Sequence, residues 1–211
     1  MSTIHTVKQG EYLSKIAQKY GVKDYRLIWN HPENAQLKQK RKNPNVLYPG
    51  DVLIIPDQRS KEEAVLTGKL HRFRLISTQL KIRLKLNDIS AQALANKTCE
   101  LEIGGNTTQL ISDEEGILEQ VIAATDENAG LFIEEQDRHI LIKIGHLDPV
   151  EERSGQIARL NNIGYGDGHM TGQAENQFLM AVEEFQCEHE LKVDGICGSN
   201  TQSKLVEVHG C

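Results

Sequence analysis

Hydrophobic residues near the N-terminus recur at the spacing of a helix. Leu13, Ile16, Ala17 and Tyr20 stand at positions i, i+3, i+4 and i+7, which brings them to one helix face. Gly21 follows directly, at the position where a glycine commonly ends a helix. The pattern therefore predicts an amphipathic helix that begins at Leu13 and ends before Gly21.

Two short strands and a second helix are expected around this helix. Residues 5–8 precede it, residues 52–56 close the segment, and both stretches are typical of strands. Residues 24–30 fit a second helix, with Leu27 and Ile28 directed inward. The predicted order is strand, helix, helix, strand.

Three stretches of this segment resemble the LysM domain: HTVKQGEYLSKIA at residues 5–17, NPNVL at 43–47 and PGDVLIIP at 49–56. LysM domains are βααβ folds that bind the N-acetylglucosamine units of peptidoglycan or chitin. The resemblance implies a shallow groove between the loop after the first strand and the loop before the last one, where a few polar groups would hold the sugar. The glycan-binding residues that it implies are Gly10, Glu11, Tyr12, Leu13, Asn43, Pro44, Asn45, Val46 and Leu47.

Two departures from the family pattern bear on sugar binding. LysM domains usually carry Asp-Thr where this chain has Glu11 and Tyr12, and the polar, basic stretch at residues 33–42 lengthens the approach to the second loop. Either change is expected to narrow or remove the sugar groove. A LysM domain that binds protein instead therefore stays open as an alternative, and the version seen here also resembles LysM domains of contractile phage-tail and secretion-spike proteins.

A strict alternation of apolar and basic residues marks the middle of the chain. After a charged linker at residues 57–66, Leu80, Ile82, Leu84 and Leu86 alternate with cations, as in a half-buried strand. Several short strands at near-regular spacing predict a small β-sandwich. This region resembles transthyretin-like domains, and the role expected of it is that of a rigid spacer. The further strands are expected at residues 99–103, 108–111, 118–122, 131–134 and 139–144.

A second helical pattern appears near the C-terminus. Phe178, Ala181, Val182 and Phe185 share one helix face. Around them, ARLNNIGY, AVEEFQ and LKVDGICGSNT resemble the three-helix peptidoglycan-binding domain. The resemblance implies a tight turn in the DGICG motif and a structural threonine, Thr201, in the first turn of the last helix. An echo of the motif at residues 167–172 departs from the family pattern.

Length and charge fit several small modules. A chain of 211 residues spans one to three domains, and its net charge of −6 is uneven: +5 over residues 1–60, −5 over 61–150 and −6 over 151–211. The basic end lacks the stacking aromatic residues of a nucleic-acid binder, and no apolar stretch is long enough for a membrane span. The first residues resemble no signal peptide, so synthesis in the cytoplasm is expected.

Candidate catalytic and metal-binding groups are scarce, and no catalytic residue, metal or cofactor is expected. There is no H-E-x-x-H motif for zinc. His146 and Asp148, with His139 earlier, form the nearest metal-like set. Four cysteines leave four alternatives open: free thiols, a disulfide, a nucleophile or a zinc site. The residues that such sites would use are Cys187 with His189, Cys197 with His209, and Cys211.

These patterns together predict a multidomain α+β protein. We expect a LysM domain at residues 1–57, a β-sandwich spacer at 66–147 and a helical peptidoglycan-binding domain at 148–211. The expected function is non-catalytic binding of peptidoglycan glycan strands, linked to a contractile or type VI secretion apparatus that delivers the protein to the periplasm. The alternative is a protein-binding adaptor or chaperone for a secretion spike or toxin effector.

Overall fold

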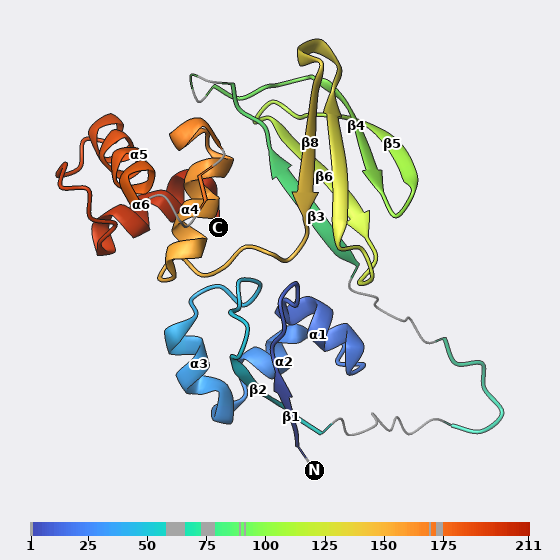
Figure 1. Ribbon diagram of the computed structural model, residues 1–211. Helices are drawn as coiled ribbons and strands as arrows, with labels where there is room; N and C mark the ends of the chain where they lie inside the picture. The colour runs from blue at the N-terminus through green and yellow to red at the C-terminus, as the bar shows by residue number, and fades with distance from the viewer. Residues whose placement is uncertain are drawn as a thin grey trace.

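Three separate hydrophobic clusters form in the computed structural model, one in each third of the chain. The structure describes residues 2–57, 66–72, 79–88, 90, 92–168, 170–171 and 175–211. Figure 1 shows the N-terminal domain (residues 2–57) below, the middle domain (79–147) above it, and the C-terminal domain (148–211) beside them. Most of the predicted linker lies outside the described residues, and the predicted domain boundaries stay predictions.

The N-terminal domain contains the predicted strand, two helices and closing strand in that order, with a 3-10 helix and a third α-helix before the closing strand. Strand β1 (Thr3–Thr6) pairs antiparallel with β2 (Val52–Ile55). Between them come α1 (Leu13–Lys19), α2 (Tyr25–Trp29), the short 3-10 helix η1 (Pro32–Asn34) and α3 (Ala35–Lys40). Helix α3 lies in the stretch that was expected only to be polar and basic.

Two details of this domain differ from the prediction. The first strand ends at Thr6, because Val7 instead exchanges hydrogen bonds with the turn before β2, to Asp51 at 2.8 Å and from Gly50 at 2.9 Å. The inward direction of Leu27 is wrong: its side chain is 59% exposed, whereas Ile28 is fully buried. Helix α2 has only five residues, so Ile28 and Trp29 already occupy its single buried face.

The middle domain consists of two antiparallel sheets around one apolar cluster. One sheet pairs β3 (Leu80–Lys85) with β6 (Ile117–Ile122). The other has the order β5-β4-β7-β8, and its strands are β4 (Thr98–Ile103), β5 (Asn106–Ile111), β7 (Asn128–Ile133) and β8 (Arg138–Lys143), with the 3-10 helix η2 (Glu134–Gln136) between the last two. Strand β3 alternates half-buried and exposed residues as predicted. The likeness to transthyretin stays a prediction.

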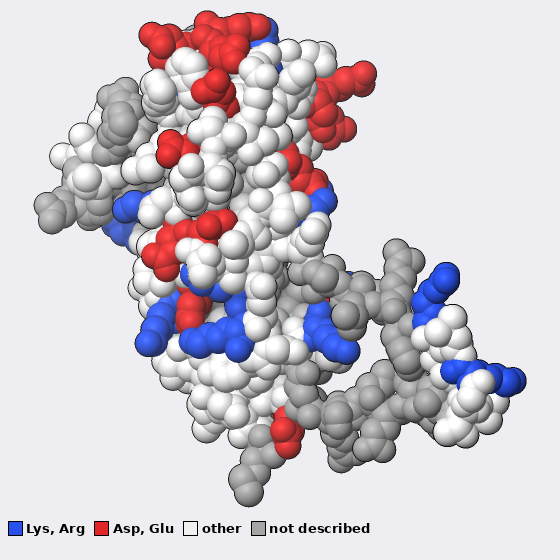
Figure 2. All heavy atoms as spheres, turned by 90° about the vertical axis from the view of Figure 1, so that its right-hand side faces the viewer, with Lys and Arg blue, Asp and Glu red and all other residues white. Residues whose placement is uncertain are grey.

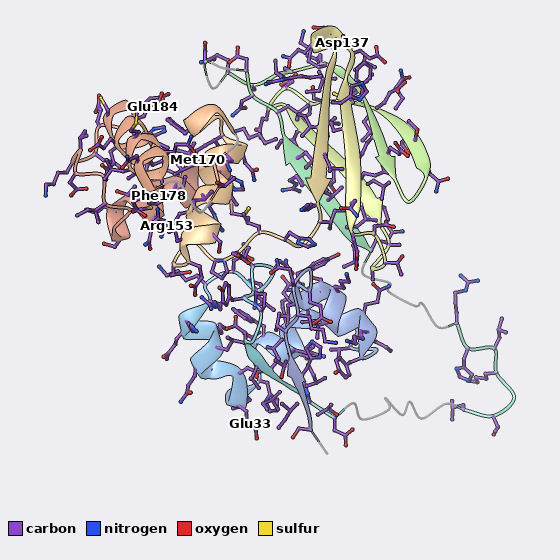
Figure 3. All side chains as sticks on the ribbon, viewed as in Figure 1. Glu33, Asp137, Arg153, Met170, Phe178 and Glu184 are labelled. Carbon is purple, nitrogen blue, oxygen red and sulfur yellow. The ribbon has the colours of Figure 1, made fainter. Side chains whose placement is uncertain are left out.

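The C-terminal domain is helical. It contains α4 (Arg153–Asn162), the 3-10 helix η3 (Tyr165–Gly168), α5 (Glu175–Glu188) and α6 (Ser199–His209). The predicted core residues of α5 are all buried. Arg153 of α4 lies 4.4 Å from the ring centre of Phe178 of α5 (Figure 3), a cation–π contact that joins the two helices. The predicted echo at residues 167–172 lies partly outside the described residues.

Charged residues are unevenly distributed over the surface of the molecule as well as along the sequence. Figure 2 shows Asp and Glu side chains gathered at the top, over the middle domain, and Lys and Arg side chains lower down, over the N-terminal domain. Asp137, labelled in Figure 3, marks the far end of the middle domain, and Glu33 marks the opposite end of the molecule. Among the described residues, no helix has the length and apolarity to cross a membrane.

Candidate functional site

The two loops of the predicted glycan groove lie against each other. The backbone N–H of Leu13 donates a hydrogen bond of 3.3 Å to the carbonyl oxygen of Pro44. One residue further along each loop, the Ser14 hydroxyl donates to Oδ1 of Asn45 at 3.0 Å. Segments about thirty residues apart in sequence therefore form a single surface, as the groove requires.

The second loop is a preformed turn on an apolar base. Oδ1 of Asn43 accepts a hydrogen bond of 2.9 Å from the backbone N–H of Asn45, the arrangement of an Asx turn. Val46 and Leu47 are buried beneath the turn, at 8% and 5% exposure. The Asn45 side chain is exposed. Asn45 is therefore the side chain of this loop best placed to meet a ligand.

Glu11 of the first loop is directed toward its own domain. Its carboxylate accepts hydrogen bonds from the Lys8 backbone at 2.9 Å, from His5 at 2.8 Å and from Lys19 at 3.2 Å. Burial opposes the charged form, but these hydrogen bonds outweigh it and lower the pKa of Glu11. The carboxylate is 12% exposed, so its contacts fasten the loop to the strand before it.

Gly10 and Tyr12 of the same loop face the middle domain. The Tyr12 ring packs against the apolar cluster of that domain, and burial, assisted by the charge of Asp126, raises the pKa of its phenol. A methyl group placed on Gly10 would lie 3.3 Å from Nε2 of His146. This side of the groove is therefore covered by protein.

The structure brings the predicted glycan-binding residues together but leaves few of them accessible. Leu13, Val46 and Leu47 are buried, while Asn45 is exposed on the rim. Ser14 was not among the predicted residues, although it lies in the stretch at residues 5–17 that resembles LysM domains and contacts Asn45. The sequence feature that could have indicated Ser14 is a hydroxyl in the first turn of a helix that begins at the predicted glycan-binding loop. A hydroxyl and an amide side by side can donate to and accept from sugar hydroxyl and acetamide groups.

The DGICG motif of the C-terminal domain takes part in one hydrogen-bond network. The Gln186 side chain is 1% exposed, and its Oε1 accepts from the backbone N–H groups of Asp194 and Gly195 at 2.9 and 3.0 Å. Its Nε2 donates at 3.0 Å to Asp194, to the Ile196 carbonyl and to Thr201. The network holds the DGICG turn against α5, which makes Thr201 structural, as predicted.

The cysteines take the first of the alternatives that the sequence left open. All four are free thiols, and His209 lies beside Cys211, with 3.3 Å between Nδ1 and Sγ, and contacts Asn162 at 3.0 Å on its other nitrogen. Burial lowers the pKa of His209 to about 4 and raises that of Cys211. At neutral pH both groups are therefore uncharged, unlike an activated thiolate–imidazolium pair.

The other candidate groups are engaged elsewhere. His146 lies against Gly10, while Asp148 accepts a hydrogen bond of 2.6 Å from Ser154 in the C-terminal domain. His189 contacts Tyr165 and Phe185. Across the ranges that the structure describes, no three His, Cys, Asp or Glu side chains gather in a way that could hold a metal ion.

Comparison with protein families supports both terminal domains. The LysM domain family matches residues 5–24, which include the first loop and α1. The family described as Putative peptidoglycan binding domain matches residues 158–205. No curated protein and no solved structure matches the chain. The two matches support a LysM domain near the N-terminus and a peptidoglycan-binding domain near the C-terminus.

Proposed function

We propose that this protein is a non-catalytic peptidoglycan-binding protein that attaches to glycan strands through both ends. The observation that carries the proposal is the presence, on one chain, of two domains whose families both bind peptidoglycan. In the LysM domain, the exposed contact between Ser14 and Asn45 supplies polar groups for an N-acetylglucosamine unit.

Two weak sites on one chain give a stronger attachment than either alone. Once one domain is bound, the second meets its ligand at a raised effective concentration. The middle domain acts as the spacer that sets the distance between them.

The setting that we propose is a contractile or type VI secretion apparatus, which would carry the protein from the cytoplasm to the periplasm. This part of the proposal rests on the likeness of the NPNVLYPGD stretch to LysM domains of phage-tail and secretion-spike proteins. The expected consequence is that the chain co-purifies with components of such an apparatus.

Sedimentation with purified peptidoglycan sacculi tests the binding. The full chain should sediment with sacculi, and Asn45→Ala and Ser14→Ala should each weaken binding of a soluble N-acetylglucosamine hexamer about five-fold, the loss of one hydrogen bond. Gln39→Ala, which removes an exposed amide from α3 of the same domain, is the matched control. No sedimentation at any salt concentration would contradict the proposal. Release of soluble fragments from sacculi, with or without added zinc, would contradict its non-catalytic part.

A second candidate function is a protein-binding adaptor or chaperone for a spike or toxin effector. The observation that favours it is that the Tyr12 side of the LysM loop already packs against protein. Under this alternative the wild-type chain would retain a spike or effector protein in a pull-down and would leave sacculi unbound.

A further inference from the structure

The first loop of the LysM domain and the turn after β8 approach each other at backbone distance. A methyl group on Gly145 would lie 2.8 Å from the carbonyl oxygen of Gly10 and 2.9 Å from Cδ1 of Tyr12. From the other side, a methyl group on Gly10 would lie 3.3 Å from the His146 ring. Only glycine permits so close an approach of the two backbone segments, so the two domains pack tightly against each other at this point.

Two ion pairs also join the LysM domain to its neighbours. Lys15 of α1 lies 3.7 Å from Glu127 of the middle domain. On the other side of the LysM domain, the buried guanidinium of Arg41 lies 3.4 Å from Glu152 of the C-terminal domain. The segment from β8 to α4 runs between the LysM domain and the other two domains in Figure 1. The LysM domain is therefore held at three points, by both of its neighbours.

The contact is also imperfect. The hydroxyl of Tyr12 is buried and has no hydrogen-bond partner, and a buried polar group without a partner costs free energy. The pair of Lys15 and Glu127 is largely open to water on the glutamate side, at 68% exposure, and such pairs contribute little. An interface with these features can open at a modest cost.

We propose that the middle domain competes with glycan for the first LysM loop, so that the docked arrangement is an autoinhibited state. In it, the turn at Gly145 and His146 covers Gly10 and Tyr12. When the interface opens, the same residues become available to a sugar. This inference rests on the proposed glycan binding and adds its regulation.

The competition has a measurable consequence. When only the open fraction of molecules can bind, the apparent dissociation constant equals the intrinsic one divided by that fraction. Any change that opens the interface without touching the groove raises affinity. Conversely, glycan shifts the chain toward the open form, because it binds that form better.

Gly145→Ala is the variant that opens the interface. Its methyl group would collide with the Gly10 backbone. The matched control is Gly105→Ala: Gly145 and Gly105 have nearly the same φ, +77° and +78°, but nothing lies within 4 Å of the methyl position at Gly105. A second pair changes charge instead: Glu152→Lys repels Arg41, and Glu151→Lys, at the exposed neighbouring position, is its control.

Two readouts on the full chain keep docking and binding apart. A carbodiimide joins Lys15 to Glu127 only while the domains are docked, and mass spectrometry measures the yield of that cross-link. Calorimetry measures affinity for an N-acetylglucosamine hexamer. Gly145→Ala and Glu152→Lys should lose the cross-link and bind the hexamer about threefold more tightly or better, while both controls should behave as wild type.

The possible results separate the inference from the proposed function. Loss of the cross-link with unchanged hexamer affinity would overturn the competition and leave glycan binding intact. A cross-link that persists in both Gly145→Ala and Glu152→Lys would overturn the docked state as described. If the undocked variants and the wild type all fail to bind hexamer and sacculi, the proposed function itself is wrong, and the competition falls with it.

Discussion

The guanidinium of Arg41 forms a bidentate ion pair with the carboxylate of Asp51: its Nε and Nη2 donate hydrogen bonds of 2.9 and 3.3 Å to the two carboxylate oxygens. The side chains are 1% and 5% exposed. Asp51 also accepts a hydrogen bond of 2.9 Å from the backbone of Tyr48. This pair therefore ties the end of α3 to the turn before β2, and it places the second loop between them.

Replacing Arg41 should lower the stability of the LysM domain. Arg41→Met leaves the Asp51 carboxylate buried without its main partner, which should lower the free energy of unfolding by about 3–5 kcal/mol. Urea denaturation measures this change. Lys40→Met is the control, since the Lys40 side chain is 62% exposed and 3.9 Å from Asp51, and it should cost under about 0.5 kcal/mol. Equal stability of the two variants would contradict the role given to Arg41.

The Gln186 network makes a parallel prediction for the C-terminal domain. Gln186→Leu keeps a similar volume but leaves the backbone N–H groups of Asp194 and Gly195 without acceptors. Unfolding free energy should fall by about 2 kcal/mol or more. The control is Gln177→Leu, at an exposed position of the same helix. If thermal or urea unfolding fails to separate the two variants, the network does not hold the turn.

Stability should depend on pH through His209. Its pKa is about 4 in the folded protein, against the usual 6.5 of a histidine side chain, so the unfolded chain binds the extra proton first as pH falls. Above pH 6.5 the ring is neutral in both the folded and the unfolded chain, and this group does not lower stability. Between pH 6.5 and 4 only the unfolded chain takes up the proton, so the free energy of unfolding falls by up to about 3 kcal/mol. His209→Gln should flatten that part of the curve.

Urea midpoints measured at pH 7 and pH 5 test this dependence. Wild type should lose stability over this interval and His209→Gln should lose much less. The carboxylate of Glu11 contributes little to the difference between pH 7 and pH 5. Its pKa is lowered from 4.5, so the stability that its charged form contributes is lost only as the pH falls below that value. The same slope in wild type and variant would contradict the assignment to His209.

The four thiols should differ in reactivity. Cys187 is exposed, Cys99 is fully buried, and burial raises the pKa of Cys197 to about 11. Because the thiolate is the reactive form, a thiol reagent should label one site rapidly in the native protein. Cys187→Ser should remove this fast phase, and denaturant should expose all four sites. A fast phase that survives Cys187→Ser would place the reactive thiol elsewhere.

Much of the fold follows from local patterns in the chain. The alternation from Leu80 to Leu86 predicted β3, and the spacing of Phe178, Ala181, Val182 and Phe185 predicted the core face of α5. Such patterns reflect the repeat of one element and need no neighbour. They fail where an element is too short: the five-residue helix α2 buries Ile28 and Trp29 and leaves Leu27 exposed.

The candidate site was predicted only in outline. The resemblance to LysM domains identified both loops, and the structure brings them together through Leu13 and Pro44. It did not distinguish the inward carboxylate of Glu11 from the exposed amide of Asn45, and it did not include Ser14. The direction of each side chain depends on partners such as His5 and Lys19, which no spacing rule identifies.

Sequence patterns indicated most of the helices and strands, the two terminal domain types and the position of the predicted glycan-binding loops, because helices, strands and turns depend on residues close together in the chain. Only the tertiary structure decided which face of those loops is free. Tyr12 meets Gly145, and Arg41 meets Glu152, across more than a hundred residues. Such contacts depend on how whole domains pack, and a linear pattern carries no record of that packing.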